Sequence, residues 1–235
     1  VKVTVDSGKY TDLVGNASAE SGSLTLAVDT IAPTVAISSS ASGLKVGATA
    51  TLTFNFSEAP ASLPTITPVL GTASGPASDA GVLGALSRQG DTNIYTATYT
   101  PPVGQAGGKV GFLIGSWGDA AGNVGLTGAA PLIEVDTVAP TVSASASASV
   151  IKAGGTSGAL PILELSFSEN PAVPPTITPS LSGVTLTPVP VLTGTGAPSN
   201  KLSYFINVPA GLEGNLSFTL GSWSDRLGNA GTAGT

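Results

Sequence analysis

Three residue types are missing from this chain of 235 residues: cysteine, histidine and methionine. Without cysteine no disulfide can form, so stability must come from sheet packing or from bound ions. Without histidine and cysteine the chain also lacks the commonest general base, the thiol nucleophile and the usual ligands of transition metals. These absences argue against an enzyme and against a zinc site.

Charged residues are scarce as well. They make up 9% of the chain, and eight Lys and Arg against fourteen Asp and Glu leave a net charge of −6. Nucleic-acid binding requires basic patches that neutralise phosphates, and the sequence has none, so nucleic acid is excluded as a partner. No apolar run reaches the roughly 18 residues that a membrane-spanning helix needs, which excludes membrane insertion. Gly (31) and Pro (18) stay below the level typical of disorder, which predicts folded domains.

The chain repeats with a period near 107 residues. Asp-Thr-Ile-Ala-Pro-Thr at 29–34 returns as Asp-Thr-Val-Ala-Pro-Thr at 136–141, a step of 136 − 29 = 107. The Asp-x-x-Gly-Asn pattern at 12–16 returns at 119–123 and again at 225–229. A period of this length corresponds to one domain per repeat, so the sequence predicts a row of similar domains.

The frame of the repeat predicts three parts. Residues 1–29 match the C-terminal strands of a preceding repeat, residues 30–137 form a complete repeat, and residues 138–235 form a repeat that lacks its last strand. We expect a section of a longer tandem array. The alternative is a complete subunit that lends its terminal strands to neighbouring copies.

The local pattern is that of β-strands throughout. Apolar and polar residues alternate over 50–56 and 163–167, and further strands are expected at 95–99, 110–114 and 132–135 and at their equivalents 204–208 and 216–220. Each unit thus offers about seven short strands in about 100 residues, which is typical of an immunoglobulin-like sandwich. The predicted fold class is all-β, with tandem immunoglobulin-like β-sandwich domains.

This fold brings repeated polar residues to one end of each unit. The second strand and the sixth both run toward the incoming linker, so the loops that follow them lie beside it. Asp29 is in the linker, Glu58 ends the second strand, and Asp119 and Asn123 lie in the loop after the sixth. The equivalent set in the next unit is Asp136, Glu169, Asp225 and Asn229.

Three carboxylates held close together repel one another, so the cluster needs an explanation. Oxygen ligands without His or Cys favour Ca²⁺, with nearby backbone carbonyls completing its coordination. The alternative is ordinary turn chemistry, because Asp and Asn often hydrogen-bond their own backbone and point into water. A catalytic carboxylate pair for glycoside hydrolysis is disfavoured, since a site repeated in every unit indicates a structural role.

Three motifs together resemble a known family. Val-Asp-Thr-x-Ala-Pro-Thr (28–34, 135–141), Phe-Ser-Glu (56–58, 167–169) and Ser-Trp-x-Asp-x-x-Gly-Asn (116–123, 222–229) are similar to bacterial Ig-like tandem repeats of large surface adhesins, of the RTX or biofilm-associated type. The resemblance implies an extracellular, cell-surface stalk whose partners are the neighbouring repeats of the same chain. It also implies junctions rigidified by Ca²⁺ at Asp29, Glu58, Asp119, Asp136, Glu169 and Asp225.

Other features carry smaller predictions. Trp117 and Trp223 stand beside the acidic loop, where a Trp that caps the sandwich is favoured over one that binds sugar. Prolines flank Thr-Ile-Thr at 65–67 and 176–178, which predicts edge strands, and the pairs Gly107-Gly108 and Gly154-Gly155 predict turns. Two other function classes stay open: a subunit of an extracellular filament, sheath or surface layer assembled by strand exchange between copies, and a carbohydrate-binding module.

Overall fold

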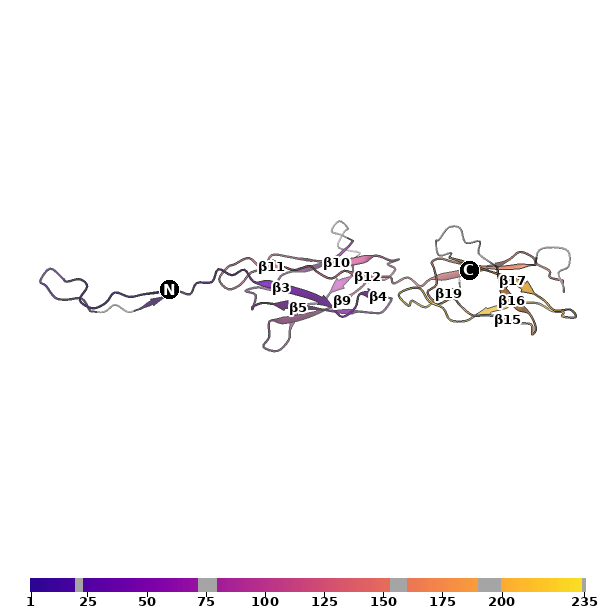
Figure 1. Ribbon diagram of the computed structural model, residues 1–235, viewed down its shortest axis with the longest axis horizontal. Coiled ribbons are helices and arrows are strands. Elements are labelled where there is room, and N and C mark those ends of the chain that lie inside the picture. Colours follow the sequence, from indigo (N-terminus) through magenta and orange to yellow (C-terminus); the bar gives the residue numbers. More distant parts are fainter. Residues whose placement is uncertain (20–22, 72–79, 153–159, 190–199, 234–235) are drawn as a thin grey trace.

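The computed structural model of the chain describes residues 1–19, 23–71, 80–152, 160–189 and 200–233. Every regular element in these ranges is a β-strand, which confirms the predicted all-β class. Figure 1 shows an N-terminal ribbon followed by two β units along the long axis. The ribbon consists of β1 (Lys2–Val3) and β2 (Leu24–Thr25), which pair antiparallel. The same ranges contain no helix that is long and apolar enough to cross a membrane.

The first unit, residues 30–137, is a sandwich of two sheets. The larger sheet has the strand order β11-β3-β5-β9-β7, with β8 also paired to β9. These strands are β3 (Thr34–Ser39), β5 (Ala50–Phe56), β7 (Val82–Leu83), β8 (Ser87–Arg88), β9 (Ile94–Thr100) and β11 (Leu126–Thr127). The smaller sheet has the order β4-β12-β10-β6. Its strands are β4 (Gly43–Leu44), β6 (Ile66–Leu70), β10 (Lys109–Ile114) and β12 (Ile133–Val135).

The core of the first unit lies between these two sheets. Along β5, every second residue is buried, because successive side chains of a strand point to opposite faces. Leu52 and Phe54 of the larger sheet belong to the same buried cluster as Val110 and Ile133 of the smaller one. The alternation predicted for residues 50–56 is therefore confirmed, and it determines which face of the strand packs inward.

The second unit, residues 138–233, repeats the arrangement. One sheet has the order β16-β17-β14-β13-β19, and β15 pairs antiparallel with β18. The strands are β13 (Thr141–Ala146), β14 (Ile162–Phe167), β15 (Ile177–Pro179), β16 (Thr185–Pro188), β17 (Lys201–Asn207), β18 (Phe218–Leu220) and β19 (Thr232–Ala233). The side chains of Leu163, Leu165 and Phe167 are buried along β14, as the alternation predicted.

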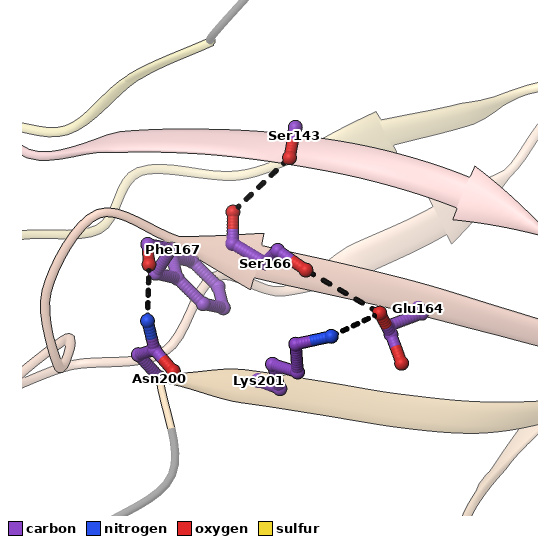
Figure 2. A network of polar contacts seen from close by, with 6 residues as sticks. All are labelled: Ser143, Glu164, Ser166, Phe167, Asn200 and Lys201. Carbon is purple, nitrogen blue, oxygen red and sulfur yellow. Dashed lines mark hydrogen bonds and ion pairs between the residues drawn. The ribbon is translucent and has the colours of Figure 1, made fainter.

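Polar contacts join three neighbouring strands of the second unit (Figure 2). The Lys201 ammonium of β17 lies 2.8 Å from a carboxylate oxygen of Glu164 on β14. The side-chain amide of Asn200, the residue before β17, donates to the backbone carbonyl of Phe167, the last residue of β14, at 2.8 Å. Both partners of the ion pair are exposed, so we assign it a small contribution to stability and a role in strand register.

The prolines and tryptophans lie where the sequence predicted. β6 contains Pro68 and is the outermost strand of its sheet, a position that requires fewer backbone donors. Trp117 and Trp223 are buried, and each packs edge-on against a phenylalanine, Phe56 or Phe167, with ring centroids 5.0 Å apart. They are core residues, so they offer no exposed platform for sugar binding.

The strands β11 and β19 are among the short strands that the sequence did not predict. β11 and β19 each follow the Asp-x-x-Gly-Asn turn and pair parallel with the first strand of their own unit. Strands of two residues are too short for periodicity to indicate them. The glycine at position 107 has φ +74°, in keeping with the predicted turn, whereas Gly154-Gly155 lies outside the described residues.

Candidate metal centre

Each unit gathers three carboxylates at its linker end. In the first unit they belong to Asp29, Glu58 and Asp119, and one oxygen from each lies within 4.8 Å of the other two. The second unit brings together Asp136, Glu169 and Asp225 with the same closeness. The convergence expected from strand directions is thus present in both units, although the binding of an ion stays a prediction.

The segments that carry these side chains are far apart in the sequence. Asp136 lies in the linker between β12 and β13, Glu169 follows the end of β14, and Asp225 lies in the loop between β18 and β19. Pairing of β13 with both β14 and β19 holds the three segments together at one end of the sheet. The cluster is therefore a product of the sandwich topology.

The third carboxylate of each cluster is held by a tight turn. Asp225 Oδ1 accepts hydrogen bonds from the backbone N–H of Gly228 at 2.7 Å and of Asn229 at 2.9 Å. Its other oxygen accepts from the Asn229 side chain at 2.6 Å. Asp119 is bonded in the same way by the backbone and side chain of Asn123, each at 2.8 Å. Asp-x-x-Gly-Asn is therefore a self-bonded turn that aims a fixed carboxylate at the linker.

The electrostatic surroundings of Asp119, in the first cluster, differ from those of Glu169, in the second. Hydrogen bonds from the Asn123 side chain, followed by backbone N–H groups, hold the pKa of Asp119 below its ordinary value. Burial, followed by the charges of Asp136 and Asp225, raises the pKa of Glu169. Glu169 accepts no hydrogen bond from any described residue, so both of its carboxylate oxygens are available as ligands.

The asparagines brace the site. Asn229 is 1% exposed, and its side-chain N–H₂ donates to Asp225 and to the backbone carbonyl of Asp136, the latter at 2.9 Å. Its carbonyl oxygen accepts the backbone N–H of Val46, in the preceding unit, at 2.9 Å. All its polar atoms thus have protein partners, which favours a positioning role over the ligand role expected for it. Asn123 similarly donates to the carbonyl of Asp29, at 3.3 Å.

Direct contacts join the two units beside the second cluster. The Lys45 ammonium donates to the carbonyl of Gly228 at 3.1 Å. Arg226 forms a bidentate ion pair with Glu134 of β12. In one of its two hydrogen bonds, Arg226 Nη1 donates to Glu134 Oε2 at 2.9 Å. Leu227 lies so close to Gly43 that an added Cβ there would be 3.0 Å from its methyl group. The turn after β18 is therefore part of a domain–domain interface, a role that sequence analysis missed.

The linker between the units is itself anchored. The Thr137 hydroxyl donates to the carbonyl of Pro102 at 2.7 Å and accepts the N–H of Gln105 at 2.9 Å. The N–H of Asp136 donates to the carbonyl of Leu44 at 3.0 Å. The first unit thus holds one side of the linker, and Asn229 of the second unit holds the other.

The donor set fits a calcium ion. Ca²⁺ binds oxygens at about 2.3–2.6 Å, so two ligands on opposite sides of one ion are about 5 Å apart. The 4.8 Å limit on the oxygen separations of each cluster is compatible with one shared ion. Three carboxylates and the backbone oxygens around them are hard ligands of the kind that Ca²⁺ prefers.

The architecture and the repeated linker motif agree with comparison to known proteins. Residues 29–133 match the bacterial Ig-like domain family, a span that covers the sandwich from its linker aspartate to the last strand. The first unit is similar to bacterial Ig-like domains. The second Ig-like unit repeats its strand pattern, its Trp and its acidic turn. No curated protein sequence matches the chain.

Solved structures of two adhesins are similar to this chain in parts. FdeC, an Escherichia coli adhesin, matches 86% of this chain and 64% of its own with 13% identity and a TM-score of 0.52, which supports the fold alone. The Yersinia pseudotuberculosis adhesin InvE matches 84% and 56% with 15% identity and a TM-score of 0.31. The chain therefore spans less than two thirds of the length of either adhesin.

Proposed function

We propose that this chain is an extender, or stalk, module of a secreted cell-surface adhesin, and that Ca²⁺ rigidifies the junctions between its Ig-like domains. The observation that carries the proposal is the position of the acidic clusters. Both include the linker aspartate, so an ion there would bind the element on which bending between domains depends. A structural role also agrees with the recurrence of the cluster in each unit.

Asp136, Glu169 and Asp225 would hold the ion at the junction between the described units. Bound Ca²⁺ supplies positive charge that offsets the mutual repulsion of these carboxylates. The three ligands come from two parts of the chain. Asp136 belongs to the linker, whereas Glu169 and Asp225 belong to the second unit. Because Thr137 fixes the linker to the first unit, a ligand that ties Asp136 to the second unit would restrict rotation between the two.

A thermal melt in millimolar Ca²⁺ and again in EGTA tests this proposal. An ion bound only by the folded state, at a concentration one hundred times Kd, adds about 2.7 kcal/mol of stability. For a domain of this size, each kcal/mol raises Tm by roughly 4–8 °C. Identical melting curves in the two buffers would contradict the calcium proposal.

Glu169→Gln is the sharpest variant for this test. It removes a carboxylate that accepts no hydrogen bond from the described residues, so the Asp225 turn stays intact. The Ca²⁺-dependent rise in Tm of the second unit should shrink in this variant and persist in Glu213→Gln, which changes an exposed glutamate of the same unit. Small-angle scattering should show a larger maximum dimension in Ca²⁺ than in EGTA, and an unchanged value would refute the stiffening.

The alternative expected from the sequence, a subunit of an extracellular filament, sheath or surface layer, stays a prediction. Neither function includes chemistry on a substrate, and we propose no enzymatic activity.

A further inference from the structure

The Asp-x-x-Gly-Asn turns have constant and variable positions. The pattern occurs at 12–16, 119–123 and 225–229, and its two middle residues are Leu-Val, Ala-Ala and Arg-Leu in turn. The constant residues build the turn, because in all three copies the aspartate accepts a hydrogen bond from the asparagine side chain at 2.6–2.8 Å. The side chains of the middle residues are not needed for these bonds, so the turn itself does not determine which residues stand there.

Arg226, the first middle residue of the third turn, contacts the first unit. Both of its Nη atoms donate to the carboxylate of Glu134, and Nη1 lies 2.9 Å from Oε2. This bidentate arrangement requires the planar guanidinium of arginine opposite a carboxylate, so few other residue pairs reproduce it. The positions equivalent to 134 and 226 are Ala27 (134 − 107) and Ala120 (226 − 106). The charged pair is therefore particular to the junction between the two described units.

Leu227, the second middle residue, lies against Gly43 of β4 in the first unit. A Cβ added to Gly43 would lie 3.0 Å from a methyl carbon of Leu227, which is closer than ordinary van der Waals contact. The junction therefore accommodates a leucine at 227 because the residue that faces it has no side chain. The position equivalent to 43 is Val150 (43 + 107), and the position equivalent to 227 is Ala121 (227 − 106). The large and the small residue are thus reversed at the equivalent positions.

The charged contact and the apolar contact respond differently to dissolved salt. The side chains of Arg226 and Glu134 are 67% and 33% exposed, and an exposed ion pair is weakened by salt. The charges of Asp136 and Asp225 also act on the guanidinium, and that of Lys109 acts on Glu134. The packing of the neighbouring leucine involves no charge. Salt concentration therefore separates the contribution of Arg226 to the junction from that of the leucine.

We infer that Arg226 and Leu227 specify the junction between the two described units. Arg226 selects a neighbouring unit with an acidic residue at position 134, and Leu227 selects one with glycine at position 43. The constant residues of the turn build it, and the two variable residues match it to its neighbour by charge and by shape. The inference requires no bound ion, so its failure would leave the calcium proposal standing.

Distances between two spin labels test the charged contact. The chain has no cysteine, so Leu113→Cys on β10 and Ser145→Cys on β13, both at exposed positions, place one label in each unit. In EGTA, the distance distribution should broaden as NaCl rises from about 0.01 M to about 1 M, because the screening length falls from about 30 Å to about 3 Å. A distribution of equal width at both concentrations would overturn the role of Arg226.

A double-mutant cycle at low salt shows whether Arg226 acts through Glu134. Arg226→Ala and Glu134→Ala should each broaden the distribution, and the double variant should be no broader than either, since both changes remove one interaction. Arg226→Lys should keep a width that depends on salt, because it retains the charge. Lys201→Ala, which removes the exposed ion pair with Glu164 inside the second unit, is the matched control and should leave the distribution unchanged. Additive broadening in the double variant would contradict the pairing.

The match in shape is tested by exchanging the large and the small residue. Gly43→Val should shift or broaden the distribution at low and at high salt, because its side chain would displace Leu227. Gly43→Val/Leu227→Ala, which introduces the residues found at positions 150 and 121, should restore the original distribution. Gly43→Ala is a milder form of the same test, and thermal melts show that each variant is folded. A folded Gly43→Val variant with an unchanged distribution, or one that Leu227→Ala does not restore, would refute the match.

Discussion

Asn229→Ala tests whether one buried amide holds the acidic turn, the linker and the preceding domain together. The side chain makes three hydrogen bonds, to Asp225, to the carbonyl of Asp136 and to the N–H of Val46. At a net value of about 1 kcal/mol each, the loss amounts to about 3 kcal/mol. With a slope of about 1.5 kcal/mol per molar urea, the unfolding midpoint of the second unit should fall by about 2 M.

Each unit must be followed separately, because a chain of two domains need not unfold in one step. Each unit contains one buried tryptophan, Trp117 or Trp223, so in a Trp117→Phe background fluorescence reports the second unit alone. Asn215→Ala is the matched control, since its exposed side chain makes no hydrogen bond with the described residues. A midpoint shift below about 0.5 M for Asn229→Ala, or an equal shift for the control, would refute the reasoning.

Three further predictions follow from the junction and the core. Gly231→Ala should lower the stability of the second unit by about 1–3 kcal/mol in urea unfolding, because its Cβ would lie 2.0 Å from the Trp223 ring, whereas Gly84→Ala, with no contact under 3.5 Å, should cost the first unit less. Arg226→Ala should broaden the interdomain distance distribution measured between spin labels and leave the melting of each unit unchanged; an unaltered distribution would contradict the role of this ion pair. In calcium-free buffer, the contribution of Glu169 to the stability of the second unit should be most favourable below its ordinary pKa, 4.5, and should be lost as pH rises through the raised pKa of the folded state. Glu169→Gln should flatten this loss in a series of melts across pH.

The local structure of each unit was predictable from its sequence. Alternation over 50–56 and 163–167 identified the strands and their buried faces, because the side-chain period of a strand is two. The 107-residue period identified tandem domains, and the repeated Asp and Glu positions identified both acidic clusters. These signals are local, or recur in register, and a single sequence carries them without further information.

The roles of Asn229 and of Arg226 became clear only in three dimensions. Asn229 bonds Val46, which is 183 residues away, and Arg226 reaches Glu134 across the junction. Such contacts depend on how two folded domains meet, and no periodicity along the chain encodes that geometry. The sequence by itself determined the main strands, the repeat and the positions of the acidic residues, whereas their binding of Ca²⁺ stays a prediction. The tertiary structure decided which amides brace the turn, which carboxylates come together and which residues join the two units, because these depend on segments brought together by folding.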